Sequence, residues 1–402
     1  MIGAIVFAIT YVLISVRRLG YFPLGRPGAA LLGAVACVAL GVIPAREALG
    51  AVDGDTILLL FGMMGIGAFL ELDGFASRVE SWVALRVRTR RRLLTIIVWG
   101  SGAAAALVTN DAVCVLGAPI VVALIRAHGL PPAPYLIALA TAANTGSVAT
   151  LVGNPQNMLC ASLGHLDYRF YLLTMLPVAV VGLAINHAVI ALVHRRDLDG
   201  ELRGGSESAP LVDRRIAITL AVVAGTTALY LSGIHLAWTA VAGFTALLLV
   251  HRRDASDVWP KIEWAVLLFF SSLFIVVEGL MKSGVPAWLF EHVPLAAAGE
   301  SLPRLSAIFL VGSNIVSNVP FILVIREQMG TLANPRLAWQ LLAMASTFAG
   351  NLTLLGSVAN IIVAERARSV GGLGFFTYLR VGLPVALSTT LIGTVWLMVV
   401  AR

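Results

Sequence analysis

The chain has 402 residues, of which 59% are hydrophobic and only 12% are charged. A soluble domain carries about 25% charged residues, so a protein that faces water over most of its surface is excluded. The formal net charge of +7 comes from Lys and Arg residues that lie between apolar stretches. That placement is typical of membrane proteins and argues against a nucleic-acid-binding function.

Along the chain, ten apolar stretches are long enough to cross a bilayer, which takes about 17 to 25 helical residues. The polar stretch 195–215 divides them into two sets of five, and we expect it to be a cytoplasmic linker. The first set is 1–16, 28–44, 55–72, 135–163 and 170–193, and the second set is 216–232, 235–250, 264–281, 338–365 and 376–400.

Two further apolar segments, 93–126 and 303–326, carry polar residues at their centres. Each could be one transmembrane span interrupted by polar residues or a re-entrant hairpin that turns at its polar tip. If both are hairpins, 21 of the 28 Lys and Arg residues fall in connections on one side of the membrane. The positive-inside rule assigns that side to the cytoplasm, which favours the hairpins and places both termini outside.

Five crossings per half is an odd number, so the two halves must have opposite orientations in the membrane. The predicted fold is therefore an all-α polytopic membrane protein, an inverted repeat of five transmembrane helices plus one hairpin in each half. The repeats are 1–194 and 216–402. Residues 150–157 match residues 353–360 at an offset of 203, and the two hairpin tips match at an offset of 208.

The stretches 135–163 and 338–365 contain Gly, Asn, Ser, Thr and Pro residues that favour a break in a helix. Non-helical backbone at membrane depth survives only inside protein or around water, and its free carbonyls and helix ends can hold ions or solutes. The alternative is close packing of small residues between helices. The predicted substrate- or ion-binding residues in these two stretches are Asn144, Thr145, Thr150, Gly153, Asn154, Asn157, Thr347, Asn351, Thr353, Gly356, Ser357 and Asn360.

The hairpin tips complete the predicted site with Thr109, Asn110 and Asp111 in the first half and Ser317 and Asn318 in the second. A carboxylate at the centre of an apolar segment is costly and usually functional. We therefore interpret Asp111 as the residue that couples transport to a proton or sodium ion. The alternative is a structural cap on the helix that follows it.

The sequence lacks the motifs of a metalloprotease or a nucleotide-binding loop, so we expect neither an enzyme nor a resident cofactor or metal. The three cysteines, Cys37, Cys114 and Cys160, lie in apolar segments and are expected to be packing residues.

These motifs resemble the ion transporter superfamily, in particular the arsenite permease (ArsB) and sodium/proton antiporter (NhaD) group. The resemblance rests on Thr109-Asn110-Asp111, on AANTGSVATLVGNPQN at 142–157, on Ser317-Asn318-Val319-Pro320 and on ASTFAGNLTLLGSVANIIVAE at 345–365. Among its members, the bacterial permeases related to plant silicon efflux transporters are especially similar. Sodium-coupled dicarboxylate carriers are more distantly similar, but they carry Thr at the position of Asp111.

The resemblance implies an elevator-type transporter of the cell inner membrane that forms a homodimer. Its partners would be the lipid bilayer and a small solute or ion, with no nucleic acid. We expect proton- or sodium-coupled efflux of a small neutral oxyacid such as arsenite, antimonite or silicic acid. Sodium-coupled carboxylate or inorganic-anion transport and sodium/proton antiport stay open, with Asn110, Gly153 and Asn154 as candidate sodium ligands.

Overall fold

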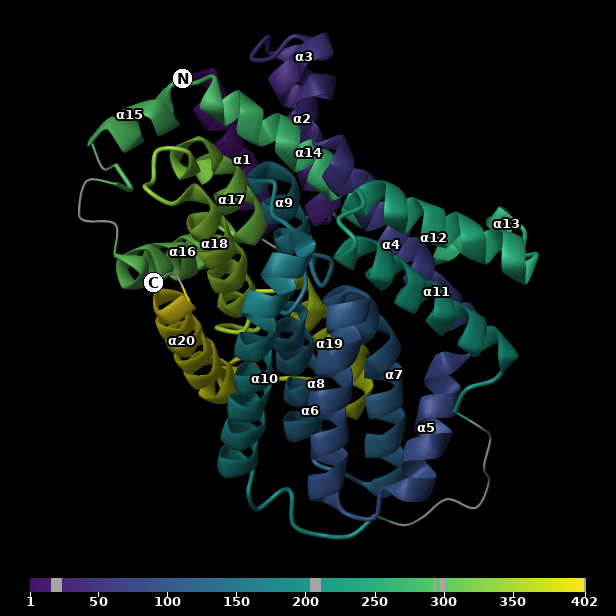
Figure 1. Cartoon of the computed structure of the whole chain (residues 1–402). Coiled ribbons are helices and arrows are strands. Elements are labelled where there is room, and N and C mark those ends of the chain that lie inside the picture. Colours follow the sequence, from purple (N-terminus) through teal and green to yellow (C-terminus); the bar gives the residue numbers. More distant parts are fainter. Residues whose placement is uncertain (16–23, 203–210, 293, 297–300, 401–402) are drawn as a thin grey trace.

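The structure, a computed structural model, describes residues 1–15, 24–202, 211–292, 294–296 and 301–400. This part of the chain is built from helices, and its one strand-like pairing is a single antiparallel bridge between Thr89 and Glu201. In Figure 1, α6, α7, α8 and α10 stand side by side in the lower part of the molecule, while α11 and α12 lie to their right.

The first half contains ten helices among its described residues. They are α1 (Ile2–Ser15), α2 (Arg26–Ala39), α3 (Ala45–Gly50), α4 (Gly54–Leu72), α5 (Phe75–Arg86), α6 (Arg90–Leu107), α7 (Asn110–His128), α8 (Pro132–Ser147), α9 (Pro155–Gly164) and α10 (Tyr168–Val193).

The second half repeats this order with short additions. Its described elements are α11 (Arg214–Leu231), α12 (Leu236–His251), α13 (Ala255–Val258), η1 (Trp259–Lys261), α14 (Trp264–Met281), α15 (Val285–His292), α16 (Leu302–Val316), α17 (Asn318–Met329), α18 (Pro335–Ala349), α19 (Val358–Arg366), η2 (Ala367–Val370) and α20 (Phe375–Val400).

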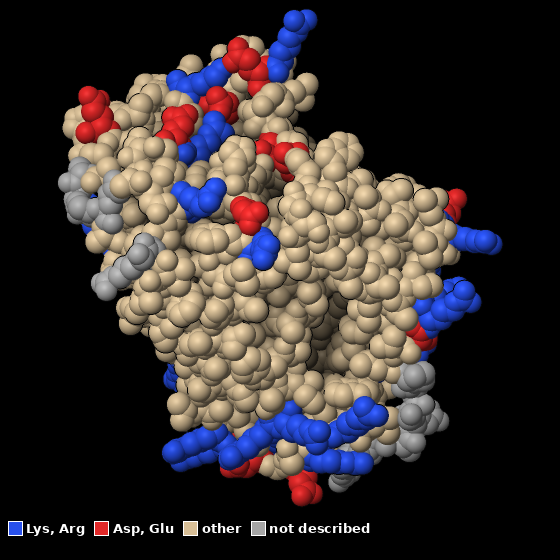
Figure 2. Space-filling view, in the orientation of Figure 1, with Lys and Arg blue, Asp and Glu red and all other residues tan. Residues whose placement is uncertain are grey.

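Six of these helices are long and apolar enough to cross a membrane, namely α4, α7, α10, α11, α14 and α20, and α1, α2, α12 and α16 are shorter apolar helices. The face in Figure 2 has a broad band almost free of charged side chains above a basic lower edge. That edge lies over the start of α6 and the end of α10, where the chain carries arginines at 88, 90–92, 195 and 196. Such a distribution suits a protein with several helices that cross a membrane.

Each predicted hairpin is a pair of helices joined by a very short turn. Val108 and Thr109 separate α6 from α7, and Ser317 alone separates α16 from α17. Ser317 has a φ of 70° and a ψ of 151°, a backbone region that essentially only glycine occupies without strain. Each predicted broken helix is likewise two helices, with breaks at 148–154 and 350–357.

The described part of the predicted linker is held against the rest of the protein. The Arg90 guanidinium donates to the backbone oxygen of Asp197 at 3.2 Å, and the backbone N–H of Leu202 donates to the oxygen of Arg88 at 2.9 Å. Residues 203–210 lie outside the described residues. The connection therefore has a fixed first part and returns to helix at Arg214.

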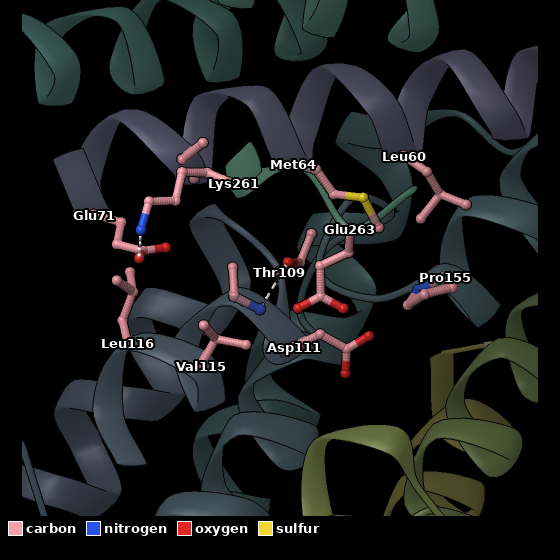
Figure 3. Close-up of a pocket in the computed structure, with 13 residues that line it drawn as sticks. Leu60, Met64, Glu71, Thr109, Asp111, Val115, Leu116, Pro155, Lys261 and Glu263 are labelled. Carbon is pink, nitrogen blue, oxygen red and sulfur yellow. Dashed lines mark hydrogen bonds and ion pairs between the residues drawn. The ribbon is translucent and has the colours of Figure 1, made fainter. Parts of the chain in front are cut away.

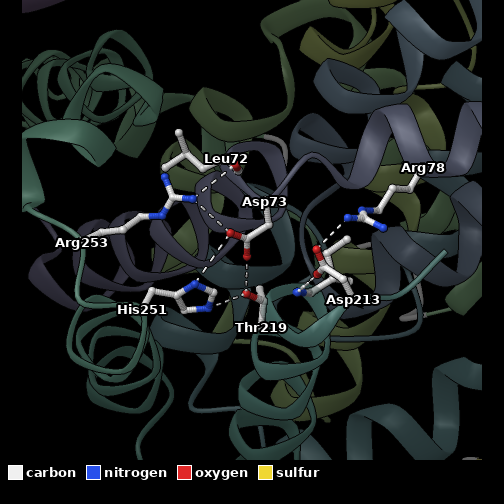
Figure 4. A network of polar contacts seen from close by, with 8 residues as sticks. Leu72, Asp73, Arg78, Asp213, Thr219, His251 and Arg253 are labelled. Carbon is white, nitrogen blue, oxygen red and sulfur yellow. Dashed lines mark hydrogen bonds and ion pairs between the residues drawn. The ribbon is translucent and has the colours of Figure 1, made fainter. Parts of the chain in front are cut away.

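A buried polar cluster fastens α4 to the second half (Figure 4). The Asp73 side chain is fully buried, accepts a hydrogen bond from Thr219 Oγ1 at 2.9 Å and lies 3.4 Å from the Arg253 guanidinium. His251 lies beside both, with Nε2 3.2 Å from Thr219 Oγ1. A buried carboxylate needs such partners, so this cluster fixes α4 to α11 and α12.

Small residues allow the helices around the broken segments to approach closely. Gly146 in α8 lies directly against the backbone of Gly102 in α6, and a Cβ atom at Gly146 would overlap the Gly102 carbonyl group. All three cysteines are buried and free, as expected for packing residues. The helices that carry the two breaks are thus enclosed by close backbone contact, which leaves little room for larger side chains.

We predict that Gly146→Ala destabilises the protein by about 1–3 kcal/mol, because the added methyl group forces α6 and α8 apart. The measurement is the apparent melting temperature in detergent. Gly100→Ala on α6 is the matched control, since a Cβ there meets no atom within 4 Å and alanine favours the helix. Equal melting temperatures for the two variants would contradict this account of the α6–α8 contact.

Candidate functional site

The two broken helices cross each other at their breaks, and side-chain amides fill the crossing. Asn144, at the end of α8, donates from Nδ2 to Asn351 Oδ1 at 3.1 Å and to Asn360 Oδ1 at 3.0 Å. Its own Oδ1 accepts from Asn110 Nδ2 at 2.9 Å and from Ser357 Oγ at 3.2 Å. One buried side chain thereby joins both breaks and the first hairpin tip.

The contacts at the crossing occur in pairs related by the sequence offset of 203. Asn157 donates to the backbone oxygens of residues 147 and 150 at 3.2 and 2.9 Å. Adding 203 to 157, 147 and 150 gives 360, 350 and 353, and Asn360 donates to the oxygens of residues 350 and 353 at 2.8 and 3.1 Å. Each asparagine thus satisfies carbonyl groups that its own broken helix leaves free.

The bonds between the halves follow the same offset. Asn144 Nδ2 bonds Asn360 Oδ1 at 3.0 Å, and the equivalent Thr347 Oγ1 bonds Asn157 Oδ1 at 3.0 Å. Thr347 Oγ1 also accepts from Asn154 Nδ2 at 3.2 Å. The matched residues of the two motifs therefore occupy equivalent places and hold each other.

Both hairpin tips rest on the breaks. The backbone N–H of Asn110 donates to the oxygen of Gly153 at 2.8 Å, and Asn318 Nδ2 donates to the oxygen of Gly356 at 3.4 Å. Both asparagines are buried, and the amide oxygen Oδ1 of each has no hydrogen-bond donor among the described residues. A buried acceptor without a donor costs about 1–3 kcal/mol, so both tips have an unmet need for a donor or a cation.

A cavity of about 690 Å³ lies against the two tips, the start of α9 and the second break, and residues of α1, α2 and α14 also line it. Of the predicted site residues, those that line it are Asn110, Asp111, Ser317, Asn318, Gly356 and Ser357. Nine others are buried and do not line it, namely Asn144, Thr145, Thr150, Gly153, Asn154, Asn157, Thr347, Asn351 and Asn360, and Thr353 is half-buried and also does not line it. The two motifs are therefore brought together as predicted, but many of their polar groups bond to each other in this conformation.

Asp111 lies in the wall between this cavity and a smaller chamber of about 40 Å³ (Figure 3). The chamber is also lined by Thr109, Glu263 and an ion pair between Glu71 and Lys261 with 2.6 Å between Oε1 and Nζ. Among the described residues, the Asp111 carboxylate has neither a hydrogen bond nor an ion pair. It is thus available to a mobile cation.

The structural alternative for Asp111, a helix cap, is wrong. Thr109 occupies the cap position of α7, and its Oγ1 accepts the backbone N–H of Ala112 at 3.2 Å. Asp111 lies inside the first turn, where a negative charge still interacts favourably with the helix dipole. Helix capping therefore does not explain why an aspartate occupies this position at the cavity wall.

The polar cavity and chamber residues that the sequence analysis missed include three that lie close to predicted site residues. Ser313 and Asn314 lie one turn before the second tip, and Glu263 lies at the start of α14. The helical spacing of Ser313 from Ser317 was a usable signal. Nothing local identifies Glu263, because its approach to Asp111 depends on where the start of α14 lies in the folded protein.

Comparison with known proteins decides the family. The sequence profile of the citrate transporter family, CitMHS, matches residues 11–349. This chain belongs to the citrate transporter family. The resemblance to the ArsB/NhaD group of ion transporters is thereby confirmed, and the protein is a multi-pass membrane protein and a secondary transporter.

Two relatives of this family member cover almost its whole length. The silicon efflux transporter LSI3 of Oryza sativa subsp. japonica is 30% identical over 98% of this chain and 96% of its own length. A Dictyostelium discoideum protein that carries the name arsB is 26% identical over 97% of this chain and 90% of its own length.

The fold is also similar to a solved structure. The crystal structure of the Alcanivorax borkumensis YdaH transporter matches with a TM-score of 0.57 and 17% identity, over 99% of this chain and 98% of that one. At this identity the match describes the shared fold alone.

We predict that Asn144→Ala lowers the stability of this transporter by about 2 kcal/mol or more. The Asn144 amide donates to two buried acceptors and accepts from two donors, and the substitution removes all four hydrogen bonds. The apparent melting temperature in detergent measures the loss of stability. Asn334→Ala is the control, since Asn334 caps the exposed start of α18 with one bond to Leu337 N and should cost about 1 kcal/mol. An Asn144→Ala effect no larger than the control would contradict a bracing role for the crossing.

Proposed function

We propose that this transporter exports a small neutral oxyacid, such as arsenite, antimonite or silicic acid, in exchange for protons or sodium ions. The observation that carries the proposal is the pair of amide oxygens on Asn110 and Asn318, both buried, both without donors and both at the same cavity. An uncharged solute with several O–H groups supplies the donors that these oxygens need.

A fully ionised carboxylate supplies acceptors only, so it would place negative oxygens against the amide oxygens. The tips and the breaks also contain no Lys or Arg that could compensate. The cavity does contain arginine at its rim, where Arg368 pairs with Glu365 at 3.7 Å. Sodium-coupled carboxylate or inorganic-anion transport is the alternative that the name of the citrate transporter family supports.

Sodium/proton antiport is the second alternative, with a sodium ion near Asn110, Gly153 and Asn154. In this conformation the Gly153 oxygen accepts the N–H of Asn110 at 2.8 Å. Asn154 Oδ1 likewise accepts the N–H of Asn157 at 2.8 Å. A sodium ion would share these two oxygens with the hydrogen bonds that they already accept, and it would leave Asn318 Oδ1 without a partner, so we favour the oxyacid.

The proposed architecture is ten crossings and two re-entrant hairpins in an inverted repeat, in the cell inner membrane and with both termini outside. The contacts repeated at an offset of 203 support the repeat. The hairpins and broken helices would move as one body, as in an elevator, against the other helices of a homodimer. Arg26, Glu365 and Arg368 line the cavity and belong to connections that the charge bias assigns to the cytoplasm, which supports a cavity open to that side.

Proteoliposomes that contain the purified protein test the substrate. Uptake of arsenite, silicic acid and citrate would be measured under an imposed pH gradient and, separately, a sodium gradient. We expect accumulation of arsenite or silicic acid driven by the pH gradient. Citrate accumulation driven by sodium would instead support the carboxylate alternative, and sodium-for-proton exchange without any solute would support antiport.

For coupling, we predict that Asp111→Asn reduces gradient-driven uptake at least about tenfold, because a neutral amide cannot bind and release a proton at neutral pH. Exchange of labelled for unlabelled solute at equal pH should persist. The control is Glu278→Gln on α14, since Glu278 pairs with Arg326 at 2.7 Å and does not line the cavity. Gradient-driven uptake that survives in Asp111→Asn would remove the coupling role from this residue.

A further inference from the structure

The four helix starts around the cavity differ in how they are capped. In the first half, Thr109 Oγ1 caps α7 by accepting from Ala112 N at 3.2 Å, and Asn154 Oδ1 caps α9 by accepting from Asn157 N at 2.8 Å. In the second half, the residues at the cap positions of α17 and α19 are Ser317 and Ser357, and neither side chain makes a capping hydrogen bond.

The backbone amides at the starts of α17 and α19 are therefore left without partners. Among the described residues, no acceptor meets the N–H groups of Val319 or Val358, and both residues line the cavity. The Ser357 hydroxyl instead donates to Asn144 Oδ1 at 3.2 Å and does not cap α19. Open helix starts offer hydrogen-bond donors and a partial positive charge to a solute oxygen.

Ser313 gives a second and independent indication of a ligand on this side. It lies on α16, lines the same cavity and is 99% buried, yet its Oγ has no hydrogen-bond partner among the described residues. A buried helical serine usually bonds the carbonyl four residues earlier, as Ser101 does with the oxygen of Ile97. Together with the unpartnered Oδ1 of Asn318, it leaves two polar side-chain atoms unsatisfied beside the open start of α17.

We propose that Ser313, Asn318 and the open start of α17 form a subsite that binds hydroxyl groups of the solute. A solute oxygen accepts from the α17 amides, while its O–H groups donate to Asn318 Oδ1 and to Ser313 Oγ. The solute docks mainly on the second half and gives one further O–H to Asn110 Oδ1, while the first half, whose two helix starts are each capped by one side chain, keeps Asp111 for the coupling ion. This assignment rests on the proposed function and adds Ser313 as a specificity-determining residue.

The chain offers a matched control on the same helix. Ser306 lies seven residues before Ser313, hence on the same face of α16, and is equally buried. Its Oγ accepts from Thr394 Oγ1 at 2.7 Å, and it does not line the cavity. Both serines can be changed to alanine with the loss of one buried hydroxyl. Ser306 bonds within the protein away from the cavity, whereas Ser313 lines the cavity and has no bond within the described protein, so only Ser313→Ala is expected to change the affinity for the solute.

The experiment measures Kd for arsenite and for silicic acid by calorimetry on the purified protein, and KM for the transported solute in proteoliposomes. We expect Ser313→Ala to raise Kd and KM about fivefold, the value of one net hydrogen bond, without changing the dependence of transport on the pH gradient. Ser306→Ala should leave Kd and KM within twofold of the native values, and Ser313→Thr, which keeps a hydroxyl, should restore most of the affinity.

The outcomes separate this subsite from the proposed function. Unchanged Kd in Ser313→Ala, or an equal rise in Ser306→Ala, would overturn the subsite while the native protein still binds and transports the oxyacid. Native protein that binds neither arsenite nor silicic acid would overturn the proposed substrate class and the subsite with it. If transport by Ser313→Ala depended differently on the pH gradient from transport by the native protein, the assignment of the coupling ion to the first half would be overturned.

Discussion

Every backbone carbonyl that is freed inside a membrane protein needs a donor, because lipid supplies none. In this protein part of that requirement is met by two asparagines, Asn157 and Asn360, each of which donates to two carbonyls of its own broken helix. Once the breaks are held in this way, the hairpin tips can rest on them and the cavity can form between them. The arrangement of tips, breaks and cavity thus depends on a small set of amide hydrogen bonds.

A second set of hydrogen bonds, between the two breaks, joins the two halves at their centre. Asn144 of the first half and Thr347 of the second each reach into the opposite break. A body built in this way has buried polar contacts between the repeats. This agrees with the proposal that the broken helices and hairpins move as one unit, since its internal bonds need not change when it moves.

Much of this was predictable from the sequence, for physical reasons. Gly, Asn and Pro residues in a long apolar stretch predict a helix break, and the structure has breaks at 148–154 and 350–357. Helical spacing did not reveal which asparagines face the cavity and which face each other, because that depends on how the two breaks cross. Glu263 was missed because its neighbour Asp111 lies far away in the sequence and meets it only through the packing of α14.

The cavity, at about 690 Å³, is as large as pockets that hold drug-sized ligands. An oxyacid of a few atoms fills only a small part of it. Exclusion by size therefore cannot provide selectivity while the cavity is open, and larger metabolites and water can enter with the solute. Discrimination must come from the pattern of donors and acceptors at the tips, or from a closed state too narrow for larger molecules.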